Sequence, residues 1–89
     1  MHAVVVTVKI SDREQAVQGL RDMVVPQVKS EPGFISGTWL GTEDGTTGHS
    51  VVLFDTKEHA EAASKNVARP PDAPVTIAYN QVYEVVAQA

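Results

Sequence analysis

The sequence predicts an α+β fold with four β-strands and two helices in the order βαββαβ. Two observations lead to this prediction. The spacing of apolar residues changes between the strand period of two and the helical period of about 3.6, and clusters of Gly, Pro and polar residues separate the segments. The 89 residues are 43% hydrophobic and 20% charged, which is typical of one globular domain. We therefore expect one domain over residues 1–89 and exclude a multidomain enzyme, a disordered chain and a coiled coil.

The first strand is expected over residues 3–10, where every even position is Val or Ile and one apolar face results. A helix should begin directly after it, because Ser11 and Glu14 have the spacing of a capping box. Apolar residues then recur at helical intervals: Val17, Leu20, Val24 and Val28. Pro26 lies inside this pattern and removes a backbone donor, so a kink or a broken last turn is expected there.

A hairpin is expected to follow this helix. Glu31-Pro32-Gly33 should end the helical segment, since Pro cannot continue it and Gly supplies a free positive φ. Apolar-rich segments at residues 34–41 and 49–55 then predict two strands, and the polar, Gly-containing residues 42–48 predict the turn between them.

The second helix is expected over residues 56–68, because Asp55 and Glu58 again have capping-box spacing. Its apolar face would carry Ala60, Ala63 and Val67. The Pro-rich residues 69–74 predict an extended loop. The last strand should cover residues 75–86, which is long for a small domain, and it should be bent or bulged near Asn80.

The predicted order is that of a ferredoxin-like βαββαβ sandwich, with an antiparallel sheet and both helices on one face. Such a sheet should be polar on its other face. Strict alternation in the last strand instead gives two apolar faces, with Val75, Ile77, Tyr79, Tyr83 and Val85 on one and Ala78, Val82 and Val86 on the other. Because the helices cover only one face, we expect a second subunit to cover the other, and so a homodimer.

Three junctions of the chain resemble a known family. They are Glu31-Pro32-Gly33-Phe34, Phe54-Asp55-Thr56-Lys57-Glu58 and Val82-Tyr83-Glu84-Val85-Val86. With the element order, they are similar to the dimeric α+β barrel superfamily and, within it, to the antibiotic-biosynthesis-monooxygenase-like proteins. The resemblance implies a homodimer with a barrel-like core and a pocket between each sheet and its helices. The family includes cofactor-independent oxygenases of quinols and aromatics, haem-degrading enzymes, and proteins without a known activity.

The chain departs from the active members of this family. Those members orient their substrate with Asn, Trp and His or Tyr. Here the first strand has no Asn, the only Trp lies on the second strand, and Phe54 stands where many relatives have Trp. His59 lies in the second helix between Glu58 and Glu61, in a polar stretch. The catalytic residues therefore stay unknown, and none is carried over from the family.

Three residues are the candidates for binding a substrate: Trp39, His49 and Phe54. Trp39 could stack on a flat ligand, although a lone Trp that shares a strand face with Gly37 is more often an anchor of a core or an interface. His49 could act as a base or hold a substrate hydroxyl, and the alternative is a solvated histidine at the end of a turn. Tyr79 could donate its phenol, with dimer packing as the alternative use.

No cofactor or metal is expected. The chain has no Cys and no dinucleotide or phosphate-binding motif, and His2, His49 and His59 share no ligand spacing. Nucleic acid is not expected as a partner either, since the net charge is −4 and the seven Lys and Arg residues are scattered. The apolar N-terminal stretch is interrupted before it reaches membrane-spanning length, so we expect no membrane association and a cytoplasmic protein.

Two functions are compatible with these observations. The first is a cofactor-independent monooxygenase, an oxidoreductase that acts on a small aromatic or quinol-type substrate, as the resemblance implies. The second is a non-catalytic dimeric module that binds a small apolar ligand or serves only for assembly. Fold analogy favours the first, and the lack of a recognisable polar set favours the second.

Overall fold

The computed structural model describes residues 1–67 and 75–89. Its elements follow the predicted order and are β1 (His2–Ile10), α1 (Arg13–Gly19), η1 (Leu20–Val24), α2 (Val25–Lys29), β2 (Phe34–Gly41), β3 (Thr47–Phe54), α3 (Lys57–Lys65) and β4 (Val75–Glu84). The α+β class is thus confirmed. The second helix ends at Lys65, with Asn66 as its C-cap, and so is shorter than the predicted 56–68. The loop expected at residues 69–74 lies outside the described residues.

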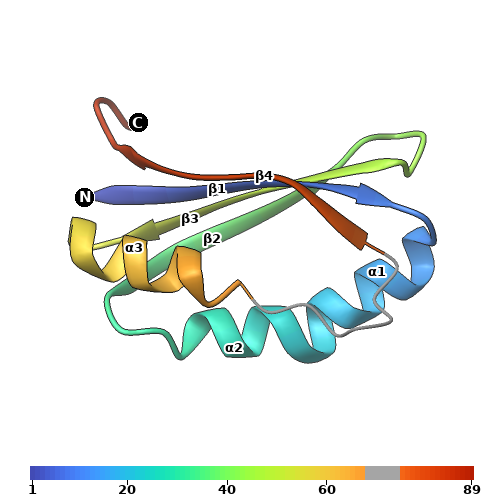
Figure 1. Cartoon of the computed structure of the whole chain (residues 1–89), viewed down its shortest axis with the longest axis horizontal. Helices are drawn as coiled ribbons and strands as arrows, with labels where there is room; N and C mark the ends of the chain where they lie inside the picture. Colours follow the sequence, from blue (N-terminus) through green and yellow to red (C-terminus); the bar gives the residue numbers. More distant parts are fainter. Residues whose placement is uncertain (68–74) are drawn as a thin grey trace.

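The four strands form one antiparallel sheet in the order β2-β3-β1-β4. The helices lie together on one side of it (Figure 1). This arrangement is compatible with a ferredoxin-like fold. Both chain ends lie at the same end of the sheet, and the C-terminal segment rises on the side away from the helices (Figure 1).

The first helical segment begins one residue later than predicted. Asp12, not Ser11, is the N-cap, and its carboxylate accepts a hydrogen bond from the Gln15 N–H at 3.1 Å. Both residue types cap helices well, and their adjacency made the two starts equivalent in the sequence. The same shift occurs at α3, where the Thr56 hydroxyl, not Asp55, accepts from the His59 N–H.

Pro26 is accommodated without ending the helical segment. The chain passes from α1 through the π-helical turn η1 into α2, and the Val25 N–H bonds to the Leu20 carbonyl. Pro26 then occupies the first turn of α2, where its missing N–H is tolerated. The irregularity expected at Pro26 is therefore present as a π turn on its N-terminal side.

The last strand contains the bulge expected near Asn80, but the face assignment by strict alternation did not allow for it. On β1, Thr7 and Val8 are adjacent, but their partners Tyr79 and Ile77 on β4 are two residues apart. The extra residue, Ala78, shifts the alternation by one. Val75 and Ile77 therefore lie on the helix side, and Tyr79 and Tyr83 on the opposite side, so the predicted grouping of all four on one face was wrong.

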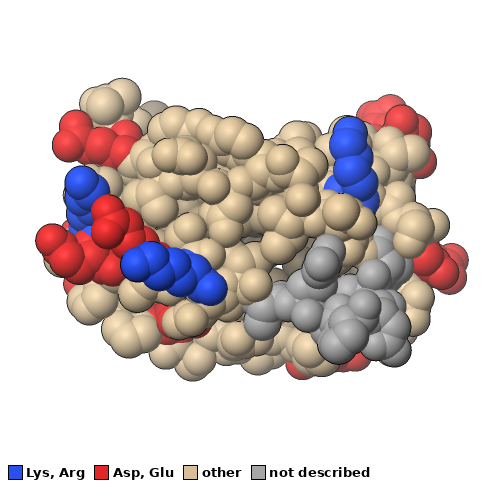
Figure 2. Space-filling view, viewed as in Figure 1, with Lys and Arg blue, Asp and Glu red and all other residues tan. Residues whose placement is uncertain are grey.

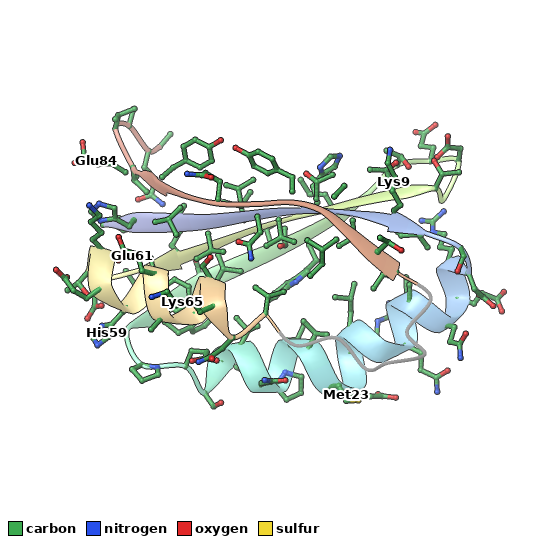
Figure 3. All side chains as sticks on the ribbon, viewed as in Figure 1. Lys9, Met23, His59, Glu61, Lys65 and Glu84 are labelled. Carbon is green, nitrogen blue, oxygen red and sulfur yellow. The ribbon has the colours of Figure 1, made fainter. Side chains whose placement is uncertain are left out.

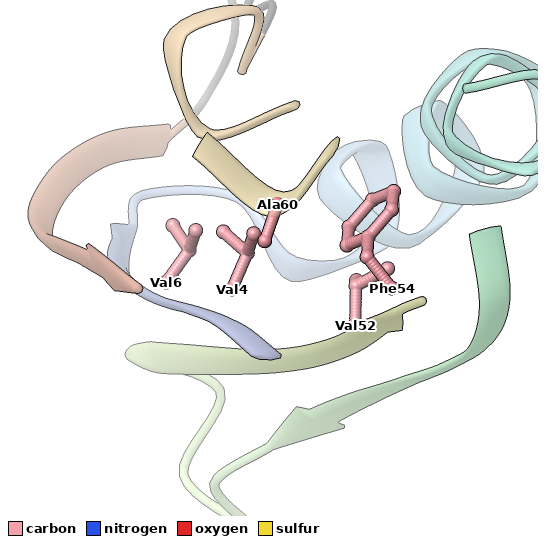
Figure 4. Close-up of a cluster of buried hydrophobic side chains, with 5 residues drawn as sticks. All are labelled: Val4, Val6, Val52, Phe54 and Ala60. Carbon is pink, nitrogen blue, oxygen red and sulfur yellow. The ribbon is translucent and has the colours of Figure 1, made fainter. Parts of the chain in front are cut away.

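The best-packed part of the core lies between the sheet and α3. Figure 4 shows its five buried side chains, Val4, Val6, Val52, Phe54 and Ala60. Phe54 is only 1% exposed, and its ring meets Phe34 edge to face, with centroids 6.4 Å apart. Beneath α1 and η1 the packing is looser, because Val17, Leu20 and Val24 are each only half-buried.

No helix within residues 1–67 and 75–89 has the length and apolar character needed to span a membrane.

Candidate functional site

Trp39 lies on the helix side of the sheet. Its neighbours across the sheet are Ser50 on β3 and, through it, Val6 on β1. The indole covers Gly37, since a Cβ atom placed on Gly37 would stand 2.7 Å from the Trp39 ring. Trp39 is half-buried and packs against the core cluster. The indole therefore packs against the backbone of its own strand.

The space beside Trp39 is apolar with one polar pair. Half-buried residues from several elements lie on this side: Val8, Val28, Val67 and Ile77. The Asn80 side chain lies in the sheet row of Val6 and is bonded to Ser64 of α3. It donates to the Ser64 carbonyl and accepts from the Ser64 hydroxyl, both at 3.0 Å. Both polar atoms of the Asn80 amide are thus bonded to Ser64, and the side chains around Trp39 are otherwise apolar.

Phe54 shares the helix side with Trp39 but is enclosed by the core. At 1% exposure its ring cannot contact a ligand without rearrangement. Phe34, which was not among the predicted site residues, is half-buried and stacks on it edge to face. The position of Phe34 directly after the Pro32-Gly33 turn was the signal that could have identified it.

His49 lies on the opposite side of the sheet from Trp39 and Phe54. It is exposed, and its Nδ1 shares a 3.1 Å hydrogen bond with the hydroxyl of Thr7, its partner on β1. The four-stranded sheet separates it from the indole. The structure thus brings Trp39 and Phe54 to one side and places His49 alone on the other.

The side of the sheet that carries His49 is named here the open face. It consists of three rows that cross all four strands: Leu40, His49, Thr7 and Tyr79; Thr38, Val51, Val5 and Gln81; Ser36, Leu53, Ala3 and Tyr83. None of these residues is Asp, Glu, Lys or Arg. Large apolar or aromatic side chains are well exposed on it: Leu40 (53%), Tyr83 (46%), Tyr79 (41%) and Val51 (36%). The two tyrosine hydroxyls hydrogen-bond to each other.

Charged residues flank the open face at its two ends. Figure 3 shows Lys9 and Glu84 on the side of the sheet away from the helices, at opposite ends of the molecule. Figure 2 shows, from the same direction, charged side chains gathered toward both ends, with an uncharged band between them. A hollow of about 460 Å³ lies on this face between the sheet and residues 84–88.

One pair of polar side chains was missed by the sequence analysis. His59 Nδ1 lies 2.6 Å from Asp55 Oδ1, and this hydrogen bond holds the pKa of Asp55 below its ordinary value. A Cβ atom on Gly33 would stand 2.2 Å from the same carboxylate oxygen, so the pair needs a glycine there. The i,i+4 spacing of Asp55 and His59 at a helix start was the available signal.

A second surface hollow, of about 540 Å³, lies along the first helical segment. Its lining residues belong to that segment alone: Arg13, Glu14, Val17, Gln18, Arg21 and Asp22. Because no other element supplies an opposing wall, this hollow is not a candidate site. Within residues 1–67 and 75–89, no three His, Cys, Asp or Glu side chains gather closely enough to hold a metal ion.

Comparison with protein-family models and with curated proteins finds no match for this chain. The class of protein defined by its fold is an α+β domain with a four-stranded antiparallel sheet, helices on one side and an uncharged open face on the other.

Proposed function

We propose that this protein is a homodimeric module that pairs through the open face and binds a small apolar or aromatic ligand between the sheet and the helices. The observation that carries the proposal is the open face itself, three complete sheet rows without a charged side chain. Interface centres are depleted of charge and enriched in tyrosine, and this face has both properties.

The size of the face supports a second copy as its occupant. Three rows about 6.7 Å apart, over four strands about 4.8 Å apart, give a footprint on the order of 400 Å². A contiguous uncharged patch of this size is typical of an interaction surface.

Sedimentation of the wild type and two variants tests the dimer. Val51→Lys places a charge on the open face, and Met23→Lys places the same charge at a residue that is 49% exposed on the outside of the helical layer. The wild type and Met23→Lys should sediment at twice the chain mass at micromolar concentration, and Val51→Lys at the chain mass. A monomeric wild type, or a dimer insensitive to Val51→Lys, would contradict pairing through this face.

The ligand-binding part of the proposal rests on Trp39. The indole is half-buried and packs against apolar side chains of the core, whereas His49, the candidate base, is on the other side of the sheet. Because His49 does not lie beside Trp39, it cannot act as a base on a ligand there, and this favours ligand binding over catalysis by proton transfer.

Indole fluorescence tests ligand binding. Titration with 1,4-naphthoquinone should quench the single Trp in a saturable way. Gly37→Ala should weaken this binding, because its Cβ would meet the ring at 2.7 Å and displace it. Gly41→Ala is the matched control, since its Cβ would meet nothing within 4 Å. Linear, non-saturable quenching, or equal effects of the two variants, would contradict a site at Trp39.

Cofactor-independent oxygenation of a quinol-type substrate is the second candidate function. The Asn80 side chain supports it, because this amide on the Trp39 side could orient a substrate hydroxyl while the substrate itself supplies electrons to oxygen. Oxygen uptake with a naphthohydroquinone, measured against its uncatalysed oxidation, decides between the two functions. Protein-dependent uptake that Asn80→Ala abolishes would establish oxygenation, and saturable binding without uptake would establish the non-catalytic module.

A further inference from the structure

His49 occupies an unusual position for a titratable group. It lies on β3, one of the two central strands, within the open face. Its Nδ1 is engaged by the Thr7 hydroxyl, and its other neighbours are Leu40 in the row and, along the strand, Val51 on one side and Thr47 on the other. If a second copy covers this face, the imidazole passes from water into an apolar contact.

The charges around His49 cannot compensate a proton on its ring. From β1 the nearest charged group is Lys9, two residues beyond Thr7, which would repel an imidazolium. From β4 the facing titratable groups are Tyr79 and Tyr83, whose hydroxyls bond to each other. From β2 the facing residues, Ser36, Thr38 and Leu40, carry no charge.

The nearest acidic groups lie beyond the ends of the face. In the β2–β3 turn, Asp44 accepts hydrogen bonds from Thr42 and from both the hydroxyl and the N–H of Thr46. All three bonds reach Oδ1, and Glu43 is the other carboxylate of this turn. Glu84 lies at the opposite end of the face from Lys9 (Figure 3). Within residues 1–67 and 75–89, the three rows of the open face thus hold no acidic partner for a protonated His49.

We propose that protonation of His49 dissociates the dimer, so that assembly through the open face is acid-sensitive. This inference rests on the dimer proposed above. A neutral imidazole, bonded to Thr7, is compatible with an apolar interface. Burying two imidazolium ions, one from each copy, each near a Lys9, costs free energy that no counter-charge offsets.

The expected size follows from linkage. Each dimer excludes the protonated form of two histidines, one from each copy, so the dissociation constant should rise by about 100-fold as the pH falls from 8 to 5.5. At low pH, log Kd should then fall by about two for each unit of pH increase, because each dissociating dimer takes up about two protons.

Sedimentation equilibrium at several pH values tests this, with circular dichroism to show that the fold persists at each pH. The wild type should follow the steep dependence, and His49→Gln should keep the pH 8 affinity with less than about a threefold change down to pH 5.5. His59→Gln is the control, because His59 lies in α3 on the other side of the sheet; it should behave as the wild type. If His49→Gln is monomeric at pH 8, His49→Leu takes its place as the non-titrating variant.

The outcomes separate this inference from the dimer itself. A wild type that is monomeric at every pH would overturn both. A dimer whose affinity is independent of pH, or whose pH dependence survives in His49→Gln and in His49→Leu, would overturn only the role of His49. A dimer that tightens on acidification would mean that a carboxylate of the second copy reaches His49, and this would overturn it as well.

Discussion

At the scale of single residues, two glycines control what their neighbours can do. Gly37 lets the Trp39 indole lie against the backbone of its own strand. Gly33, with φ of +80°, both turns the chain into β2 and leaves room for the Asp55–His59 pair. Because neither position carries a side chain, Trp39 can pack against β2 and the Asp55–His59 pair can form at the start of α3.

Gly33→Ala should destabilise the fold by about 1 to 2 kcal/mol from its left-handed backbone alone. The Cβ would also displace the Asp55–His59 pair, so the loss should be at least this large. Chemical denaturation at fixed protein concentration measures it. Gly41→Ala, at a strand position with open space around the Cβ, should leave stability nearly unchanged. Equal stability of the two variants would contradict the described turn.

Asp44 should make the hairpin acid-sensitive. Hydrogen bonds from Thr42 and Thr46 lower the pKa of Asp44 to about 2, from the usual 3.8. Because the folded pKa is depressed, the stabilisation is present above about pH 4 and is lost as the pH falls toward 2. Hydrogen exchange of the Thr46 amide, which donates to Asp44 at 3.0 Å, should therefore lose protection over that range. In Asp44→Asn the protection should not vary between pH 4 and 2.

At the scale of elements, the helix starts depend on one side chain each. Asp12 caps α1 and Thr56 caps α3, and each accepts the N–H three residues later. The first helical segment also has to accommodate Pro26, and the π turn η1 does so. The side chains of this segment that face the sheet, Val17, Leu20 and Val24, are only half-buried, whereas Ala60 of α3 is fully buried.

Asp12→Ala should cost about 1 kcal/mol, because the Gln15 N–H loses its acceptor. Asp12→Asn should be nearly neutral, since the amide oxygen can accept the same bond. Urea denaturation compares the two variants. A loss of the same size in both would show that the charge of Asp12, not its capping bond, stabilises α1.

At the scale of the whole molecule, the two sides of the sheet differ in kind. One side holds the core beneath α3 and the looser region beneath α1 and η1. The other is the open face, with exposed Leu40, Val51, Tyr79 and Tyr83. Apolar side chains exposed over a contiguous patch of this size mark an interaction surface in soluble proteins.

If the open face pairs two copies, stability should depend on protein concentration. Each tenfold increase should add about 1.4 kcal/mol to the unfolding free energy of a dimer, and the denaturation midpoint should rise with it. Val51→Lys should show a midpoint independent of concentration. A wild-type midpoint that does not move over a hundredfold range of concentration would exclude coupling between folding and dimerisation.

Local patterns determined the elements of this protein. Alternation from Val4 to Ile10 predicted β1, the helical stripe from Val17 to Val28 predicted the first helical segment, and Pro32-Gly33 predicted its end. These signals depend on neighbours a few residues apart, so they are visible in the sequence. The cap positions were off by one because adjacent residues at both helix starts can cap.

Tertiary structure decided what each face of the sheet presents. The bulge at Ala78 is set by pairing with β1, and it moved Tyr79 and Tyr83 onto the face opposite to Ile77. The helices pack on the side of the sheet that carries Trp39, so His49 lies on the side without helices. Strand alternation states only which residues share a face. The sequence indicated a bulge near Asn80, but the exact residue of the bulge and the face that the helices cover are determined by contacts between segments far apart in the chain.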